Sequence, residues 1–474
     1  MKETVPNVLA ARYAGRPMVD IWSPAAKVRM ERRFWVAVLE AQRQVGVDVP
    51  EGVVEDYEAA IDKVDLDSIE ARERVTKHDV KARIEEFCAL AGHEHVHKGL
   101  TSRDLTENVE QLQVRDSLVL VRDRMVAAGA RLARLASANS TTALTARTHN
   151  VPAQVTTLGK RFANAGEELL QALARVEDLL ERFPLRGLKG PVGTQADQLE
   201  LVGGDLRRLD ELERKVASRL GFRRILTNVG QIYPRSLDLD VVGALVQAVS
   251  GPSSLAVTIR LMAGDDLATE GFLPGQVGSS AMPHKMNSRS CERVNALTAV
   301  LRGYLVMIAG LAGDQWSEGD VSCSAVRRVA LPDAFLATDG LFETFLTVLD
   351  NFSAFPAMIE RELDRELPFL ASSRILLALL AAGLGREQAH ELVREHALAA
   401  AQARRQGSGG RDFIARLAAD RRVALSEEGL RAVVAEPLEH VGAARRQVAD
   451  FVEQVEAVVA RHPEAAGYVP AEIL

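Results

Sequence analysis

The sequence predicts an all-α protein, and three observations support this fold class. Ala, Leu, Glu and Arg, which are good helix formers, are abundant among the 474 residues. Segments in which apolar and polar residues alternate, as they do in half-buried strands, are scarce. Apolar residues recur at intervals of three and four, which places them on one face of a helix. We therefore expect a bundle of long helices, divided into roughly two to four domains because the chain is too long for one compact core.

The clearest helical repeat lies in the first third of the chain. Its apolar positions follow one another at steps of 3, 4, 3, 4 and 3, at Leu118, Val121, Met125, Ala128, Leu132 and Leu135. A second stretch of the same kind contains Leu209, Leu212, Val216 and Leu220. Narrow apolar stripes of this type are typical of coiled coils. They predict a bundle that can continue across subunits.

Segments rich in glycine, proline and serine predict the loops between the helices. They cover residues 183–193, 271–280 and 406–410. A polar turn near Thr101 and a proline after Ala354 are the best candidates for domain boundaries.

Composition narrows the class of partner. Apolar residues make up 47% of the chain, which allows a large core, and the net charge of −7 argues against nucleic acid as the main partner. Three cysteines far apart in sequence favour a reducing compartment without disulfides. The first residues lack an apolar leader, and the longest nearly apolar run, residues 375–385, is too short to span a membrane. We expect a cytoplasmic protein that uses no membrane, metal or cofactor, since metal and nucleotide-loop motifs are not found.

Residues 276–293, which read QVGSSAMPHKMNSRSCER, form the strongest candidate site. Gly278 precedes two serines, so the backbone can turn sharply and direct its N–H groups inward. A serine hydroxyl becomes a useful base only where backbone N–H groups and a nearby cation, here Lys285, stabilise its alkoxide. The alternative is a solvated loop in which Ser280 or Ser290 caps the next helix. Spacing alone leaves both interpretations open.

Five further clusters carry polar residues that could serve chemistry. His149, in ARTHNVPAQ, could transfer protons near neutral pH, or lie on the surface beside a proline turn. TKHDV at 76–80 fits an exposed helix face, and Thr101 and Ser102 could cap a helix or bind an anion. Ser324 and Arg328 are four apart, so on a helix they could grip one phosphate. The fifth cluster is the pair Arg12 and Tyr13.

Taken together, these clusters resemble those of a known enzyme family. GSSAMPHKMN is similar to the signature loop of the fumarase/aspartase superfamily, GSSxMPxKxN. The remaining clusters occur in the order seen in the adenylosuccinate lyase family, and they are Arg12 with Tyr13, KHDV at 77–80, TS at 101–102, RTH at 147–149, GTQ at 193–195, GQIY at 230–233 and SAVRR at 324–328. The resemblance extends to about Phe369, and the last hundred residues match less distinctly.

The resemblance implies an architecture and a reaction. Family members have an all-α fold of three domains, which we place at 1–103 (N-terminal helices), 104–354 (central bundle with the signature loop) and 355–474 (C-terminal helices). They are homotetramers in which each active site draws residues from three subunits, and residues 118–135 are the kind of surface that such a tetramer core needs. The implied reactions cleave small molecules: adenylosuccinate gives AMP and fumarate, and the succinyl-carboxamide intermediate of purine synthesis (SAICAR) gives its carboxamide (AICAR) and fumarate.

The resemblance also implies residue roles. Ser279 corresponds to the general base, His149 to the general acid, and Glu292 to the group that orients His149. Lys285 and Asn287 would hold the carboxylate beside the proton that is removed, and His78 would sit near the phosphate or assist His149. The remaining implied substrate-binding residues are Arg12, Tyr13, Lys77, Asp79, Thr101, Ser102, Thr148, Gln231, Arg293, Ser324 and Arg328.

The chain departs from the family at three positions, and rival assignments exist. Gly319 stands where an arginine is common, so a contact is lost or is supplied by Arg327 or by another subunit; Ser288 replaces a proline and Lys77 an arginine. The alternatives are argininosuccinate lyase, a carboxymuconate cycloisomerase and a non-enzymatic structural relative. RTH argues against the cycloisomerase, which usually lacks this histidine.

Overall fold

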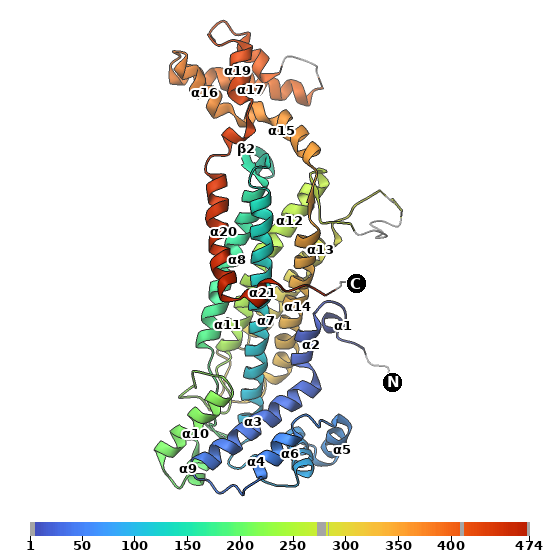
Figure 1. The fold of residues 1–474 in the computed structure, drawn as a ribbon, viewed down its shortest axis with the longest axis vertical. Coiled ribbons are helices and arrows are strands. Elements are labelled where there is room, and N and C mark those ends of the chain that lie inside the picture. The colour runs from blue at the N-terminus through green and yellow to red at the C-terminus, as the bar shows by residue number, and fades with distance from the viewer. Residues whose placement is uncertain (1–4, 273–280, 283, 408–411, 472–474) are drawn as a thin grey trace.

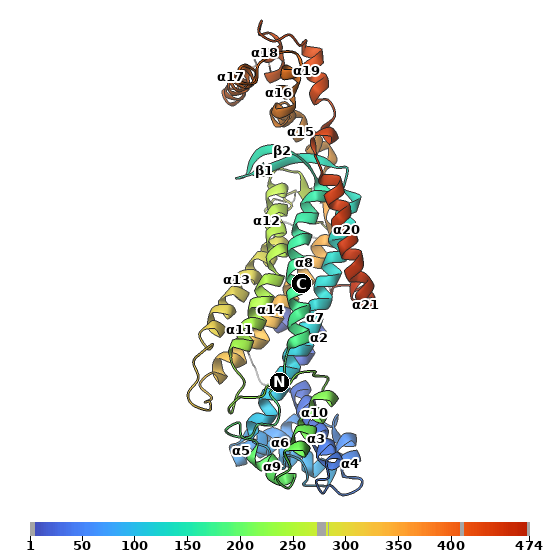
Figure 2. The same cartoon turned by 90° about the vertical axis from the view of Figure 1, so that its left-hand side faces the viewer.

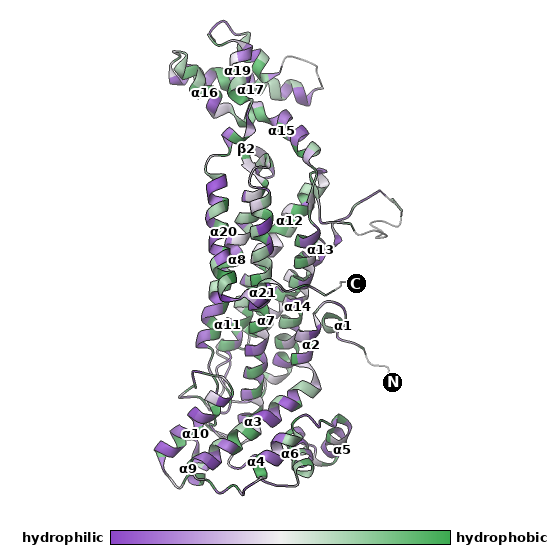
Figure 3. Ribbon diagram, viewed as in Figure 1, coloured by the Kyte–Doolittle hydropathy of each residue, from purple (hydrophilic) through white to green (hydrophobic). Residues whose placement is uncertain are grey.

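The computed structural model describes residues 5–272, 281–282, 284–407 and 412–471. Figure 1 shows an elongated molecule in which long helices run along the middle and a compact group of helices lies at each end. Polar and apolar residues are interleaved along these helices (Figure 3), as amphipathic packing requires. The predicted all-α class is confirmed. Strands are confined, in the described part of the chain, to two small antiparallel pairs.

The helices at one end belong mostly to the N-terminal part of the chain. They are α1 (Val8–Arg12), α2 (Arg16–Trp22), α3 (Pro24–Gln44), α4 (Val53–Ala60), α5 (Leu66–Thr76) and α6 (Asp79–Ala91). Two later helices, α9 (Ala196–Leu201) and α10 (Leu206–Arg219), join them at this end. The predicted stripe begins in α10, where Leu209, Leu212 and Val216 are buried, and its last residue, Leu220, is the C-cap of this helix.

Helix α7 (Ser102–Ala138) is the axis of the bundle. Its 37 residues span about 55 Å at 1.5 Å per residue. The predicted repeat falls within it, and Leu118, Val121, Met125, Ala128 and Leu132 are fully buried in this single chain. They pack in one core with α8 (Leu158–Arg182), α14 (Ser324–Asn351) and α20 (Ala444–Arg461). The expectation that this stripe forms the surface between subunits is therefore wrong, because neighbouring helices of the same chain already cover it.

The rest of the bundle is formed by α11 (Ser236–Ala248), α12 (Ser250–Gly264) and α13 (Arg289–Ala309). Within the described residues, the stretch 236–264 has the length and hydropathy of a membrane span, at a mean hydropathy of 1.4. It is divided at Val249 into two helices, and 56% of its most apolar window is buried inside the protein. Its apolar residues Val241, Leu245 and Ile259 belong to the bundle core, which accounts for the hydropathy.

A short hairpin follows α7. Strand β1 (Ala143–Thr148) pairs with β2 (Val151–Thr157), and the chain then enters α8. Figure 2 shows the hairpin lying across one end of the bundle. A second pair, β3 (Ala268–Thr269) with β4 (Ser353–Ala354), joins the ends of α12 and α14.

The C-terminal helices form a small group beyond the hairpin. They are α15 (Pro356–Leu370), α16 (Ser372–Ala381), α17 (Arg386–Arg405), α18 (Phe413–Ala418) and α19 (Glu427–Val434), and they share a hydrophobic cluster of their own. After the short helix η1 (Pro437–His440), α20 and α21 (Pro463–Ala466) return along the bundle against α7. Phe451 of α20 packs against Gly166 of α8, where an added Cβ would lie 2.1 Å from the ring.

Candidate active site

His149 lies at the tip of the β1–β2 hairpin. His149 and Asn150 have φ values of +53° and +59°, so they form the left-handed two-residue turn that tight hairpins favour. The turn exposes His149, and Thr148 beside it is also exposed. The polar, proline-containing segment predicted a turn before a helix but not this hairpin.

The signature loop is described only in part. Ser279, the predicted base, lies outside the described residues, whereas Lys285, Asn287 and Glu292 lie within them. These three residues line a cleft of about 640 Å³ beside the end of α12. Glu292 is in the first turn of α13, and its Oε1 is 4.0 Å from Arg260 Nη2 of α12.

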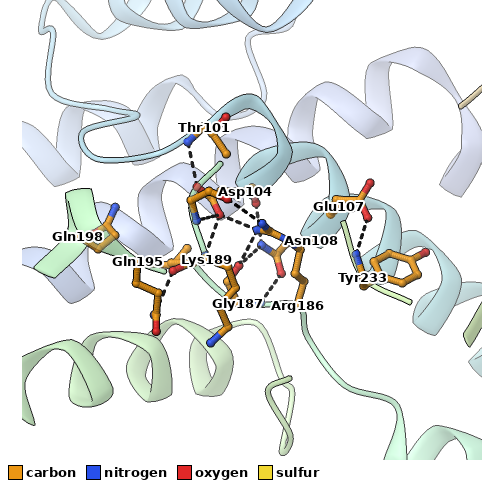
Figure 4. Close-up of polar contacts among 12 residues, drawn as sticks. Thr101, Asp104, Glu107, Asn108, Arg186, Gly187, Lys189, Gln195, Gln198 and Tyr233 are labelled. Atoms are coloured by element: carbon orange, nitrogen blue, oxygen red, sulfur yellow. Dashed lines mark hydrogen bonds and ion pairs between the residues drawn. The ribbon is translucent and has the colours of Figure 1, made fainter. Parts of the chain in front are cut away.

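The start of α7 positions a second group of predicted residues (Figure 4). The fully buried Asp104 accepts the Thr101 N–H at 2.9 Å through Oδ2, which closes a capping box. Its Oδ1 accepts hydrogen bonds from Arg186 Nη1 at 2.6 Å and from the Lys189 N–H at 2.9 Å. Because Asp104, Arg186 and Lys189 are all buried, the position of Thr101 and Ser102 is tightly determined.

His78 lies beside this helix start. Its Nε2 is 3.5 Å from Ser102 Oγ, and its Nδ1 accepts the Lys81 N–H at 3.3 Å, so the proton of the neutral ring is on Nε2. His78 caps α6, and Lys77 before it has a φ of +55°. The interpretation of TKHDV as one exposed helix face is therefore wrong: the segment is the break between α5 and α6. Asp79 lies 3.5 Å from Arg83 in the first turn of α6.

Ser324 and Arg328 approach the same place from α14. As predicted, they lie four apart at the start of this helix, and Arg328 is exposed. Arg103 Nη2 donates to Ser324 Oγ at 3.1 Å, which ties α14 to the start of α7. Arg103 is a further candidate site residue that no sequence motif indicated, although it directly follows the predicted Thr101 and Ser102.

Gln231 completes this group. Its N–H donates to the Glu318 carbonyl at 2.6 Å, and Gly230 O accepts from the buried Arg186 at 2.9 Å. Arg327 cannot replace the arginine missing at position 319. Its guanidinium is buried, and it is bound to Asp238 at 2.7 Å and to Glu110 at 2.5 Å.

A third group joins the first turn of α13 to the N-terminal segment. Arg293 Cζ lies 5.3 Å from the centre of the Tyr13 ring, a cation–π distance. Burial lowers the pKa of Arg293, and Arg12 nearby lowers it further. Arg12 and Arg293 therefore bring two positive charges close to one another, which favours an anionic ligand nearby.

One chain does not bring all the predicted residues together. Thr101, Ser102 and His78 lie where α7 begins, whereas Thr148 and His149 lie in the hairpin just after α7 ends, about 55 Å away by helix length. Across the described ranges, no cluster of three or more His, Cys, Asp or Glu side chains has a metal-binding arrangement.

Comparison with known proteins decides the family. A family model described as "Lyase" matches residues 17–303, and one described as "Adenylosuccinate lyase C-terminus" matches residues 368–451. Adenylosuccinate lyase of Saccharomyces cerevisiae is 33% identical over 453 residues, covering 94% of this chain and 93% of its own. The chain belongs to the adenylosuccinate lyase family. It is therefore an enzyme, a lyase, and its C-terminal residues carry a family signal that the motif comparison did not detect.

Other relatives agree with this assignment. Adenylosuccinate lyase of Bacillus subtilis is 31% identical and covers 82% of this chain and 88% of its own. Among solved structures, the 3-carboxy-cis,cis-muconate lactonizing enzyme of Pseudomonas putida aligns with a TM-score of 0.83 at 21% identity, covering 95% and 99% of the two chains. At that identity the likeness extends to the fold alone.

Proposed function

We propose that this enzyme releases fumarate from adenylosuccinate to give AMP, and from SAICAR to give AICAR, in the cytoplasm. The observation that carries the proposal is identity of about a third, over 94% of the chain, with a protein named adenylosuccinate lyase. An argininosuccinate substrate is the second candidate, because the signature loop is shared across the superfamily.

In the proposed mechanism Ser279 removes a proton from the carbon beside a carboxylate of the succinyl arm. The electron pair that remains forms the double bond of fumarate as the bond from carbon to nitrogen breaks, and His149 protonates the departing nitrogen. Lys285 and Asn287 hold the carboxylate while it gains enolate character. Glu292 orients His149, and His78 assists.

The charges of the described residues support a substrate with one phosphate and two carboxylates. Arg12 and Arg293 lie close to one another beside Tyr13, and Arg328 and Lys77 are exposed near the start of α7. Lys285 lines the cleft at α12. Three sets of cations are what three separated anionic groups require, although the whole chain is acidic.

We further propose a homotetramer with shared active sites. Residues at the two ends of α7 can meet around one substrate only if they come from different chains, since the helix is about 55 Å long. Helices α12 and α13 expose apolar side chains that an assembly would cover, and they are Val257, Leu261, Val300, Val306 and Met307.

The substrate is tested by incubating the purified enzyme with adenylosuccinate and following the ultraviolet change as AMP forms. We expect turnover of adenylosuccinate and none of argininosuccinate. The reverse result would assign the second candidate.

The base is tested with Ser279→Ala, which we expect to lower kcat by about 10²- to 10⁴-fold while substrate binding is largely retained, because a base acts in the transition state. Turnover is measured beside equilibrium binding of adenylosuccinate. Ser280→Ala is made in parallel, since its hydroxyl is one residue away. Wild-type kcat in Ser279→Ala would remove Ser279 from the role, and a loss only in Ser280→Ala would transfer the role to its neighbour.

A further inference from the structure

We propose that residues 468–471 are a strap that positions Arg12 and Tyr13 through a buried cluster of charges. The cluster consists of Arg124 of α7 with Asp339 and Glu343 of α14. Arg124, Asp339 and Glu343 have no assigned role in the reaction. The inference depends on the proposed function only in taking Arg12 and Tyr13 as substrate-binding residues.

The buried cluster carries more negative than positive charge. The side chains of Arg124, Asp339 and Glu343 are 3%, 0% and 1% exposed. Arg124 Nε lies 3.3 Å from Asp339 Oδ1 and 2.9 Å from Glu343 Oε1. These ion pairs lack hydrogen-bond geometry, since Arg124 Nε and Asp339 Oδ1 have no hydrogen-bond partner among the described residues. The carboxylates therefore need other donors, because a buried carboxylate without hydrogen bonds is costly.

One donor comes from the N-terminal segment. The Gly15 N–H donates to Asp339 Oδ2 at 2.7 Å, and a Cβ added to Gly15 would lie 3.1 Å from both carboxylates. Gly340, the next residue of α14, has no side chain and leaves room for Tyr13: an added Cβ would lie 2.7 Å from Tyr13 Cβ. The backbone of residues 13–15 therefore lies directly on α14 at the cluster, while the Tyr13 ring faces Arg293.

The other donors come from residues 468–471. Tyr468 Oη donates to Glu343 Oε1 at 2.7 Å, and the Ala471 N–H donates to Glu343 Oε2 at 2.7 Å. The Tyr468 ring covers Arg124, with Cζ 3.4 Å from the ring centre, and Arg131 Nη2 donates to the Tyr468 carbonyl at 2.8 Å. Burial raises the pKa of the Tyr468 hydroxyl, so it stays protonated and can donate.

The two segments are thus connected through three side chains of the bundle. Removing the Tyr468 ring uncovers Arg124 and takes a hydrogen bond from Glu343, which leaves a buried carboxylate under-satisfied. Arg124 would then be drawn toward Glu343 and away from Asp339, whose other partner is Gly15. We infer that Asp339, Glu343 and Tyr468 are positioning residues for Arg12 and Tyr13, more than 300 residues earlier in the chain.

The test compares Tyr468→Leu with Val469→Ala, a matched control at an adjacent side chain that is 76% exposed. Hydrogen exchange of residues 8–15 and steady-state kinetics with adenylosuccinate are measured on the full-length enzyme. In Tyr468→Leu we expect faster exchange at residues 8–15 and a KM raised about tenfold with a smaller change in kcat, because ground-state binding is lost. Tyr468→Phe keeps the ring over Arg124 but loses the hydroxyl. Its exchange rate at residues 8–15 and its KM should therefore lie between those of the wild type and of Tyr468→Leu.

Two outcomes would overturn the strap. One is a hydrogen-exchange rate at residues 8–15 that is the same in Tyr468→Leu as in the control Val469→Ala. The other is a loss of kcat at unchanged KM, which a general structural defect would give. Should Tyr468→Leu fail to fold, Tyr468→Phe carries the same two measurements. Absence of adenylosuccinate turnover in the wild type would count against the proposed function, while the exchange measurement would still decide the strap.

Discussion

Gly319 shows how one residue can change what its neighbours do. Its φ of +122° is a conformation that other residues rarely adopt, and its N–H donates to the Trp316 carbonyl at 2.7 Å. A Cβ added here would lie 3.3 Å from Ile232. The turn therefore fits glycine and also holds the neighbouring Glu318 carbonyl against Gln231.

Restoring the arginine that is common in the family should not improve the enzyme. We expect Gly319→Arg to destabilise it by about 1 to 3 kcal/mol, because the backbone conformation is strained for any side chain, and to raise KM through Gln231. Gly319→Ala has the same backbone strain but adds no charge. The difference in stability and in KM between the two variants therefore gives the effect of the guanidinium group. Thermal melting and steady-state kinetics measure both. An unchanged melting temperature together with a lower KM would show that the turn accepts arginine.

At this scale the sequence identified most of the candidate residues but not their surroundings. Histidine, lysine and serine stand out in dense polar motifs by residue type, but spacing left their interpretation open and only the family resemblance suggested their roles. The left-handed conformation of His149 could not, because strands β1 and β2 alternate weakly and gave no hairpin pattern. Arg103 was missed because its role depends on Ser324, 221 residues further along.

Among the elements, the start of α7 is held by several buried polar contacts. The buried Asp104 pairs there with Arg186 at 2.6 Å. One turn later the buried Glu107 pairs with Arg235 at 2.8 Å. Helix starts are usually held by a single cap, whereas this one is also bonded to the loop at 186–190.

We expect Asp104→Ala to destabilise the enzyme by about 3 to 5 kcal/mol, since Arg186 would become an unpaired buried charge. Asp116→Ala on the same helix removes a partly exposed ion pair with Arg115 and should cost under about 1 kcal/mol. Denaturant unfolding of the two variants measures the difference. Similar losses in both would mean that the buried network adds no stability beyond an ordinary surface pair.

Helix existence and length could be predicted from sequence far better than helix partners. The repeat at residues 118–135 predicted α7 correctly, but a stripe of apolar residues does not specify whether its cover comes from the same chain. Here α20 supplies part of that cover, from more than 300 residues away. The break between α5 and α6 at Lys77 and His78 could not be predicted either, because polar residues are common both on exposed helix faces and in turns.

For the whole molecule, the proposed sharing of active sites between subunits can be tested by complementation. Ser279→Ala and His149→Ala should each lose most of the activity, whereas mixed tetramers should recover activity if base and acid come from different subunits. With equal, random mixing, about one quarter of the sites would contain neither change. Activity is measured after the two variants are dissociated and reassembled together, and mass spectrometry confirms mixed tetramers.

The control for this experiment is each variant reassembled with itself, which should keep its low activity. Mixed tetramers without recovered activity would show that the base and the acid belong to one chain. That result would contradict the shared site but leave the substrate assignment untouched.

The return of α20 to the bundle has a consequence for how the protein is made. Phe451 fills the space that Gly166 leaves open on α8, so the central core stays incomplete until this late segment arrives. A ribosome delivers residues 444–461 only after the small group of helices at 356–434 has emerged. Final packing of the core therefore follows the synthesis of α20, and until then the apolar side chains of α7 and α8 that α20 covers remain exposed.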